Sequence, residues 1–463
     1  MAVTEPAPAP HPAAYEGILR RQALRESAAR TYARSLPIVP VRARGMTIEG
    51  ADGRRYLDCL SGAGTLALGH NHPVVLEAIR KVIDSGAPLH VLDLATPVKD
   101  AFTTELFATL PGQLADDARI QFCGPAGTDA VEAAFKLVRA ATGRSGLLAF
   151  TGAYHGMTAG ALAASGGAPD VRVTRLPFPQ DYRCPFGTGG EAGADIGARW
   201  TEHLLDDPKG GVPAPAGMIV EPVQGEGGVN PAPDGWLRRM REITRDRSIP
   251  LIADEVQTGV GRTGTFWAVE HSGVVPDVMV LSKAIGGSLP LAVIVYRPEL
   301  DIWPPGAHAG TFRGNQLAMA AGCATLAYVR ENRLAERAAT LGARMLARLQ
   351  ALSADHPGIG DVRGRGLMMG IELVDPEAAP LTGTAGSGSA PPPDPALAAA
   401  VQQECLHRGL IVEIGGRHSA VVRLLPPLTL TDEQATAVVD RLADALRAAE
   451  RSPYRRVPPG PTR

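Results

Sequence analysis

Cysteine is scarce in this chain of 463 residues, and the few cysteines lie far apart. No two of them have the spacing of a metal-binding or redox motif, and their number is odd. The disulfide framework of a small secreted domain is therefore not indicated, and we expect a reducing, cytoplasmic setting. The five are Cys59, Cys123, Cys184, Cys323 and Cys405.

A leader, a membrane span and a strong net charge are also missing. Residues 1–17 lack the basic start and the apolar stretch of a signal peptide, and no apolar run is long enough to cross a bilayer. The formal net charge is −2. We therefore expect neither a membrane nor a nucleic acid as a partner.

The rest of the composition, with 45% hydrophobic and 20% charged residues, is typical of a globular protein. The length allows one large domain and a smaller one. The chain opens on an Ala- and Pro-rich stretch and closes on a basic, Pro-rich one. We expect a disordered tail at 1–13, an N-terminal segment at 14–65 that joins the small domain, a large domain at 66–320, a C-terminal small domain at 321–450 and a mobile tail at 451–463.

Short apolar segments alternate with helical ones in the middle of the chain. Runs such as 217–220, 250–253 and 278–281 are apolar and predict buried strands. The segments between them predict helices, and residues 16–34 predict a further helix near the N-terminus. Alternation of this kind predicts an α/β fold with a mostly parallel sheet.

Two of these strands end on residues that suit one cofactor. Lys283 follows the strand at 278–281, and Asp254 follows the strand at 250–253. Ligands bind at the carboxyl ends of such strands, and a lysine that loses hydration there has a lowered pKa and becomes a nucleophile. A lysine with a carboxylate fits pyridoxal phosphate, whose pyridine nitrogen the acid can hold. Taken singly, Lys283 would more often be an exposed residue after a strand, and Asp254 would more often be a helix cap or a buried ion-pair partner.

Polar side chains follow three further strands. A hydroxyl and free N–H groups where a helix begins suit a phosphate, although a plain capped helix has the same pattern. An aromatic residue at a strand end can stack on a planar ring, or can belong to the core. Five strands that deliver polar residues to one edge predict a single site. The added residues are Gly127, Thr128, Tyr154, His155 and Glu221.

Arg423 lies inside the apolar stretch 411–431, and a buried arginine needs an anionic partner. That partner can be a substrate carboxylate or a structural acid, and the residues alone leave both open. His70 and His72 are two residues apart, but no further ligand lies near them, so we expect no metal site.

Six segments in order carry a family resemblance. The chain resembles the class III pyridoxal-phosphate-dependent aminotransferases, of fold type I, over about residues 35–450. The resemblance implies a large cofactor-binding domain with a mostly parallel seven-stranded sheet, and a smaller α+β domain built from the N- and C-terminal segments. The six segments are GPAGTDAVEAA, YHG, VEPVQGEGG, ADEVQTGVGRTG, LSKAIGG and TFRGN.

Longer segments, including CLSGAGTLALGHNHPVV and PLHVLDLATPVKD, resemble the diaminobutyrate–2-oxoglutarate branch of that family. That branch transfers the 4-amino group of L-2,4-diaminobutyrate to 2-oxoglutarate, giving L-aspartate 4-semialdehyde and L-glutamate. The resemblance implies small amino and keto acids as partners, and a homodimer or tetramer with active sites at the subunit interface. The alternatives are another ω-aminotransferase, for ornithine, 4-aminobutyrate or a pyruvate-linked diamine, and, less favoured, an aminomutase.

The resemblance also implies a role for each site residue. Lys283 would form the Schiff base and shuttle the proton, and Asp254 would hold the pyridine N–H. Arg423 would bind the α-carboxylate of glutamate, with Glu226 covering it while the diamine reacts. The remaining cofactor contacts would come from Gly127, Thr128, Tyr154, His155, Glu221, Val256, Gln257 and, on the neighbouring subunit's phosphate, Thr311.

One position departs from the pattern of several ω-aminotransferases. They carry an arginine directly after the Tyr/Phe-His-Gly turn, where it holds the distal carboxylate, and here that residue is Met157. The chain therefore does not follow the ornithine or 4-aminobutyrate pattern there. Candidates for the distal end of diaminobutyrate are His155, Arg30 and Tyr32.

Overall fold

A computed structural model describes residues 12–168, 170, 172–378 and 390–451. Within these residues, the centre of the fold is a seven-stranded sheet in the order β4-β12-β11-β10-β7-β5-β6. β12 pairs antiparallel with both neighbours, and the pairings between β11, β10, β7, β5 and β6 are parallel. The predicted mostly parallel sheet is confirmed. Its strands are Arg119–Phe122 (β4), Leu147–Phe150 (β5), Val173–Leu176 (β6), Gly217–Val220 (β7), Leu251–Asp254 (β10), Val278–Leu281 (β11) and Val293–Tyr296 (β12).

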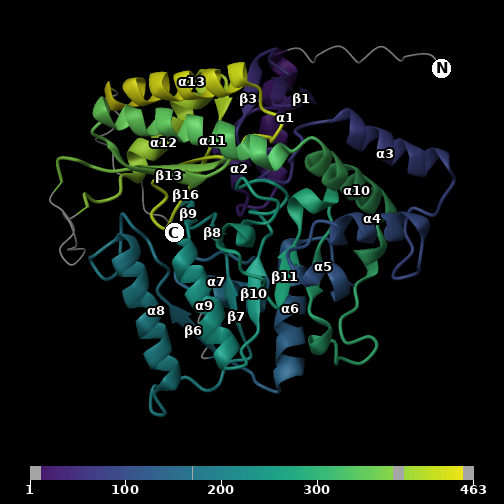
Figure 1. Ribbon diagram of the computed structural model, residues 1–463. Coiled ribbons are helices and arrows are strands. Elements are labelled where there is room, and N and C mark those ends of the chain that lie inside the picture. The colour runs from purple at the N-terminus through teal and green to yellow at the C-terminus, as the bar shows by residue number, and fades with distance from the viewer. Residues whose placement is uncertain (1–11, 169, 171, 379–389, 452–463) are drawn as a thin grey trace.

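Helices cover both faces of this sheet, which is why its inner strands are apolar throughout rather than alternating. On β5, Leu147 and Ala149 pack with the cluster beneath α6 and α7, while Leu148 and Phe150 pack on the opposite side, against α8 and α9. Figure 1 shows these helices around the lower body. Their bounds are Gly127–Thr142 (α6), Ala159–Ser165 (α7), Gly190–Asp206 (α8) and Asp234–Asp246 (α9).

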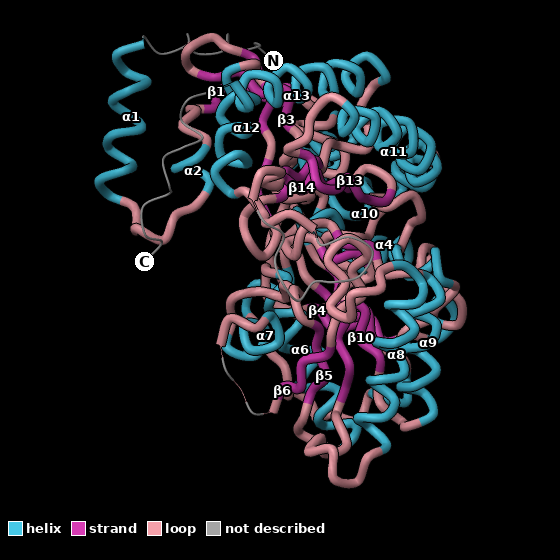
Figure 2. The backbone as a smooth tube through the Cα atoms, turned by 90° about the vertical axis from the view of Figure 1, so that its left-hand side faces the viewer, coloured by secondary structure: helices cyan, strands magenta, loops and turns pink. Residues whose placement is uncertain are grey.

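A smaller α+β body lies on top of the central sheet (Figures 1 and 2). It contains an antiparallel sheet in the order β13-β14-β17-β16, covered by three helices. The strands are Ile359–Arg365 (β13), Met368–Leu373 (β14), Glu413–Gly415 (β16) and Val421–Leu424 (β17), and the helices are Leu334–Ala351 (α11), Pro395–His407 (α12) and Asp432–Arg451 (α13).

Segments from the N-terminal and C-terminal parts of the described chain pair in this smaller body. β15 pairs in parallel with β3, so that Leu410 lies opposite Leu57. This pairing confirms that N- and C-terminal segments together form the smaller body. The sheet consists of Pro40–Arg44 (β1), Thr47–Gly50 (β2), Arg55–Asp58 (β3) and Leu410–Ile411 (β15).

The N-terminal helix differs from the prediction. The single helix expected at 16–34 is two helices, Pro12–Arg25 (α1) and Tyr32–Ser35 (α2). Between them, Ser27 Oγ accepts a hydrogen bond from the Ala29 N–H at 3.2 Å, a local bond that competes with the helical pattern. α1 stands apart from the rest of the fold in Figure 2, and α2 leads the chain back to it.

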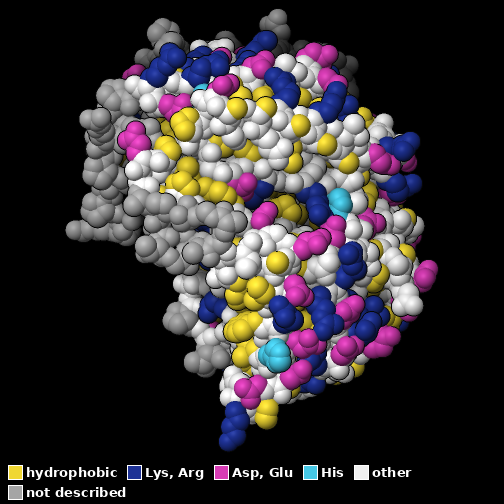
Figure 3. All heavy atoms as spheres, turned by 60° about the vertical axis from the view of Figure 1, so that its left-hand side comes forward, with side chains coloured by type: hydrophobic (Ala, Val, Ile, Leu, Met, Phe, Trp, Pro, Cys, Tyr) yellow, Lys and Arg dark blue, Asp and Glu magenta, His cyan; other side chains and the backbone are white. Residues whose placement is uncertain are grey.

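The helices extend slightly into the predicted tails, since α1 begins at Pro12 and α13 ends at Arg451. The rest of both tails lies outside the described residues. None of the helices in the described ranges has the length and apolar character needed to cross a bilayer. On the face shown in Figure 3, basic and acidic side chains are intermixed, in keeping with the net charge of −2.

The remaining elements connect these parts. α10 packs against α3 and α4 beside the central sheet. Their bounds are Pro73–Asp84 (α3), Pro97–Phe107 (α4), Leu114–Asp117 (α5), Gln316–Glu331 (α10), Val223–Gln224 (β8) and Asn230–Pro231 (β9).

Candidate active site

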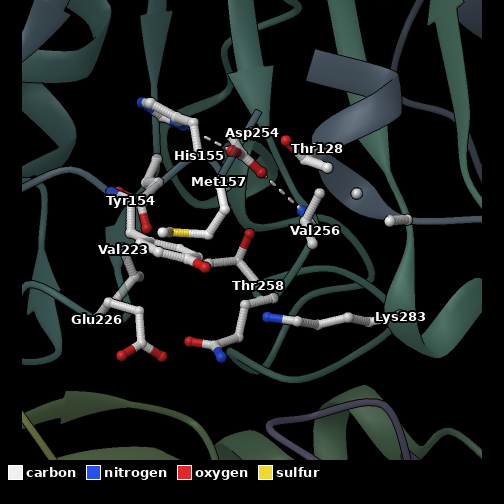
Figure 4. A pocket seen from close by; sticks show the side chains of 15 residues that line it. Thr128, Tyr154, His155, Met157, Val223, Glu226, Asp254, Val256, Thr258 and Lys283 are labelled. Carbon is white, nitrogen blue, oxygen red and sulfur yellow. Dashed lines mark hydrogen bonds and ion pairs between the residues drawn. The ribbon is translucent and has the colours of Figure 1, made fainter. Parts of the chain in front are cut away.

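A cavity of about 270 Å³ lies where five strands of the central sheet end (Figure 4). The segments that follow β4, β5, β7, β10 and β11 all contribute to its wall. The structure therefore brings most of the predicted site residues together. Those that line the cavity are Gly127, Thr128, Tyr154, His155, Glu221, Glu226, Asp254, Val256, Gln257 and Lys283.

Lys283 has an unusual backbone. It has a φ of +50°, a left-handed conformation that costs energy in a residue with a side chain and is often found at functional sites. Ser282 fixes the turn by donating a hydrogen bond to the Leu291 carbonyl at 2.8 Å. Burial lowers the pKa of Lys283, against the opposing charges of Glu226 and Asp254. A larger share of the amine is therefore neutral and able to act as a nucleophile.

Gly287 shows why this turn needs a glycine. Its φ is +56°, and an added Cβ would lie 2.3 Å from the carbonyl oxygen of Ala321 on α10. No side chain fits there, so the turn that carries Lys283 rests directly on the α10 backbone.

Asp254 is buried at the end of β10 and has two partners. Its Oδ1 accepts the Val256 N–H at 3.1 Å, and its Oδ2 lies 2.7 Å from His155 Nδ1. Burial disfavours a charged His155, but the hydrogen bond and charge of Asp254, with the charge of Glu221, raise the pKa of His155 overall. The contact thus favours the charged form of His155 beside the Asp254 carboxylate. Figure 4 shows this contact at one end of the cavity.

Glu221 holds two loops of the site together. Its Oε2 accepts the Tyr154 N–H at 3.0 Å, and its Oε1 accepts the Gly225 N–H at 3.1 Å. Burial raises the pKa of Glu221 to about 7, and the neighbouring Asp254 adds to this rise. Glu221 therefore positions the turn that carries Tyr154 and the glycine-rich loop that carries Glu226.

The N-terminus of α6 forms another part of the cavity wall. Gly127 is the first residue of the helix, and an added Cβ would lie 3.1 Å from Val256 Cγ1. Thr128 Oγ1 lies 2.6 Å from Thr158 Oγ1 and accepts the Thr158 N–H at 3.2 Å. Gly156 leaves room for this hydroxyl, since a Cβ there would approach it to 2.4 Å. Free N–H groups at the start of a long helix suit an anion.

The walls between these ends suit a planar ring. Tyr154 and Val256 lie on opposite sides of the cavity in the view of Figure 4. Gln257 donates from Nε2 to the Ala63 carbonyl at 3.0 Å. Gln257 Oε1 and His155 Nε2 are buried without a hydrogen-bond partner among the described residues. A buried lysine, a buried carboxylate, an anion-binding helix end and these free polar atoms together fit pyridoxal phosphate.

Arg423 is fully buried on β17 and meets two acids. Its Nη2 donates to Glu226 Oε1 at 2.7 Å, and it lies 2.7 Å from Glu413 Oε2. Tyr32 donates from its hydroxyl to Glu413 Oε1 at 2.7 Å. The structure thus pairs Arg423 with Glu226, as the sequence led us to expect. It adds Glu413, which the sequence analysis missed.

Glu413 had a visible but weak signal in the sequence. It lies inside the same apolar stretch as Arg423, and the two occupy facing positions of the β16–β17 hairpin. A second charge within a buried hairpin indicates a partner for the first. Of the other candidates for the distal end, Tyr32 reaches this group, whereas Arg30 donates to the Ala23 carbonyl at 2.9 Å.

Two predicted positions lie at or beyond the mouth of the cavity. Met157 lines the cavity and is largely exposed. Thr311 is exposed at the start of the turn Thr311–Gly314 and is not among the residues that line the cavity of its own chain. In the described ranges, no group of three or more His, Cys, Asp or Glu residues could hold a metal ion. His70 instead pairs with Asp58 at 2.8 Å.

A lysine and a buried carboxylate line one cavity at the strand ends of a mostly parallel sheet, an arrangement that suits a pyridoxal-phosphate enzyme. The chain belongs to the family Aminotransferase class-III, which matches residues 28–446.

Two similar proteins extend over nearly the whole chain. A protein from Rhizobium meliloti (strain 1021), named diaminobutyrate–2-oxoglutarate aminotransferase, is 54% identical over 439 residues, 93% of this chain and 92% of that protein. A protein of the same name from Haemophilus influenzae is 47% identical over 447 residues, 94% of this chain and 97% of that protein.

Solved structures agree with the fold. An (S)-enantioselective ω-transaminase from Thermomicrobium roseum is 28% identical, with a TM-score of 0.81, over 94% of this chain and 98% of that one. An amine transaminase from an uncultivated Pseudomonas species, solved in its PLP-bound form, is 29% identical, with a TM-score of 0.79, over 92% and 98%.

Proposed function

We propose that the protein transfers the 4-amino group between L-2,4-diaminobutyrate and 2-oxoglutarate, interconverting them with L-aspartate 4-semialdehyde and L-glutamate. The observation that carries this proposal is the contact between Arg423 and Glu226 beside the cavity. A buried arginine covered by a less buried acid can bind a substrate carboxylate after the acid turns away, and can be masked at other times. Both similar proteins described above carry the name of this activity.

Pyridoxal phosphate is the proposed cofactor, and it supplies an aldehyde that takes up the amino group and a ring that withdraws electrons from the reacting carbon. Lys283 attaches the cofactor and, as a free amine, moves the proton at the substrate carbon. Asp254, whose Oδ2 lies 2.7 Å from His155 Nδ1, would hold the proton on the pyridine nitrogen. The phosphate is held by Gly127 and Thr128.

The other cofactor contacts are those that the family resemblance implies, and the residues concerned line the cavity. Tyr154 and Val256 would enclose the ring from both sides and exclude water. The side chain of Gln257 would face the phenolic oxygen. Glu221 acts through Tyr154, whose backbone N–H it holds.

Arg423 and Glu226 let one pocket accept two unlike substrates. While the diamine reacts, Glu226 remains on Arg423 and neutralises it. For glutamate and 2-oxoglutarate, Glu226 turns into the open part of the cavity and the α-carboxylate takes its place on the guanidinium. This exchange of one carboxylate for another keeps the charge around Arg423 constant, so the arginine is never left unpaired.

A titration of single amino donors tests the proposed function. The purified holoenzyme is mixed in turn with diaminobutyrate, glutamate, ornithine, 4-aminobutyrate, lysine and alanine, and the yellow band of the lysine-bound cofactor is followed. We expect diaminobutyrate and glutamate to bleach it, and ornithine and 4-aminobutyrate to leave it, because Met157 departs from the arginine that the enzymes for those two donors carry. Bleaching by ornithine or 4-aminobutyrate instead would contradict the substrate assignment.

The active form is proposed to be a homodimer, alone or as half of a tetramer, in which Thr311 completes the partner's phosphate site. Large apolar side chains lie exposed around the turn of Thr311, and such patches mark interfaces. The segment 89–94 lies beside this turn, since the Val91 N–H donates to the Gly314 carbonyl at 3.2 Å. We define the apolar patch by its four exposed residues, Leu89, Leu92, Leu94 and Phe312.

Phe312→Glu should separate the dimer, because it places a charge in the middle of the apolar patch. Sedimentation is expected to show the 48.4 kDa chain alone, with cofactor affinity and turnover reduced together. Trp200→Glu, an equally drastic change at an exposed aromatic of α8, is the control and should leave the mass unchanged. A Phe312→Glu protein that keeps both its mass and its activity would contradict this interface.

The predicted domain boundaries and the cytoplasmic location remain proposals. The pairing of β3 with β15 supports grouping 14–65 with 321–450 around the large domain at 66–320. All five cysteines are free thiols, four of them buried, which suits a reducing compartment.

A further inference from the structure

Glu413 gives Arg423 more negative charge than the arginine can balance. The carboxylates of Glu226 and Glu413 both lie 2.7 Å from the same nitrogen, Nη2 of Arg423. The side chain of Glu413 is 7% exposed and that of Arg423 is 0% exposed. With both acids ionised, the three groups carry one uncompensated negative charge in a place where water is scarce.

This geometry differs from that of a structural clamp. An acid that serves to hold an arginine commonly takes two of its N–H groups in a fork. Here Nε and Nη1 of Arg423 have no hydrogen-bond partner among the described residues, although both are buried. Glu413 therefore accepts no hydrogen bond from the two nitrogens, Nε and Nη1, that Glu226 also leaves without a partner. Its Oε2 touches the arginine without a well-aligned hydrogen bond.

Glu413 is held by neighbouring residues, whereas the side chain of Glu226 is more exposed. Its Oε1 accepts the hydroxyl of Tyr32 at 2.7 Å, and its backbone is part of β16. Glu226 has a side chain that is 35% exposed and lies on a glycine-rich loop. When Glu226 turns away, Glu413 remains, held from the opposite side by the N-terminal segment.

Glu413 lies next to Glu226, which lines the cavity, and is not itself among the lining residues. Lys283 and Glu413 act on each other electrostatically, as do Lys283 and Glu226. Lys283 would hold the cofactor through its amine, which would then not be free to form an ion pair with Glu413. A cation brought by the substrate would then be the natural partner of this buried carboxylate.

We propose that Glu413 is a specificity-determining residue that receives the 2-ammonium group of diaminobutyrate while the 4-amino group reacts beside Lys283. This inference rests on the proposed function. Glutamate has a single amino group, which is the one that reacts, so it makes no use of Glu413. 4-Aminobutyrate lacks the 2-amino group and would leave the buried carboxylate unpaired, which disfavours it.

The test combines a change in the protein with a change in the ligand. Glu413→Gln keeps the size of the side chain and an acceptor for Tyr32, and Arg423 keeps Glu226. The holoenzyme is mixed with diaminobutyrate or glutamate in a stopped-flow instrument, which separates the dissociation constant from the rate of the half-reaction. The dissociation constant of 4-aminobutyrate, which is expected not to react, is measured from its inhibition of the glutamate half-reaction. Diaminobutyrate and 4-aminobutyrate differ only in the 2-amino group, so their ratio isolates its contact.

We expect Glu413→Gln to reduce the efficiency of the diaminobutyrate half-reaction by about 10- to 100-fold, the range of a hydrogen bond to a charged group. The loss should lie mainly in the dissociation constant. Glutamate and 4-aminobutyrate should change little, so the preference for the diamine over 4-aminobutyrate falls. Tyr32→Phe, which leaves the acid but removes its tether, should reduce the same preference by a smaller factor.

Different outcomes separate the inference from the proposed function. Equal losses for all three donors would show that Glu413 only supports Arg423 and would overturn the inference, as would an unchanged diamine affinity. A wild-type enzyme that does not react with diaminobutyrate would overturn the proposed function itself. If Glu413→Gln does not fold, as thermal melting would show, Tyr32→Phe carries the same comparison at a half-exposed side chain.

Discussion

Lys283→Ala is expected to reduce transamination by at least ~10⁴-fold, because it removes the group that attaches the cofactor and the group that moves the proton. No other lysine is among the residues that line the cavity. The measurement is the single-turnover rate with diaminobutyrate and with glutamate, and both should fall. The yellow band of the lysine-bound cofactor should be absent as well.

A matched control separates chemistry from general damage. Lys209→Ala changes an exposed lysine in the loop after α8 and should leave both half-reactions unchanged. Reduction of the wild-type holoenzyme with borohydride, followed by peptide mass analysis, should place the cofactor on Lys283. A Lys283→Ala enzyme with wild-type rates, or a cofactor found on another lysine, would refute the assignment.

The strand ends of the large domain could be predicted from the sequence for a physical reason. A buried strand is apolar, so the first polar residue after it marks the place where the chain leaves the sheet. Because parallel strands end at a common edge, Glu221, Asp254 and Lys283 were expected together, and they line one cavity. Each of these signals lies within a short stretch of the chain. The parallel arrangement of the strands is enough to bring the residues together at one edge of the sheet.

The environment of Arg423 could not be predicted in the same way. Tyr32 and Glu413 are 381 residues apart, and their contact depends on the break between α1 and α2, which the sequence did not indicate. The periodic pattern identified a buried arginine and the family resemblance identified Glu226. Neither showed that a third charge faces Arg423 across a hairpin, because register within a short hairpin is set by packing around it.

The left-handed backbone conformation of Lys283 could not be predicted from the sequence either. A strand followed by Ser-Lys predicts a turn, but it does not predict the φ of +50° at Lys283 or the close approach of Gly287 to α10. Such strain is held by the surrounding fold rather than by the residue that bears it. The sequence thus identified the reactive lysine, but its backbone conformation could be learned only from the tertiary structure.

Asp254→Asn is expected to slow both half-reactions by about 10²- to 10³-fold, because a neutral amide cannot hold a proton on the pyridine nitrogen and the ring then withdraws electrons poorly. His155 would also lose the charge that raises its pKa. Since Asn has the size of Asp, cofactor content should be largely retained, and absorbance of the bound cofactor measures it.

The pattern across donors distinguishes this loss from the one expected at Glu413. Asp254 acts on the cofactor, which both substrates share, so diaminobutyrate and glutamate should slow by similar factors. The expected effect is on the rate rather than on the dissociation constant, and Asp355→Asn, at an exposed aspartate of the small domain, should have neither effect. A loss confined to one donor would contradict the role of Asp254. The same ring withdraws electrons from both substrates, so its weakening must slow proton removal from both.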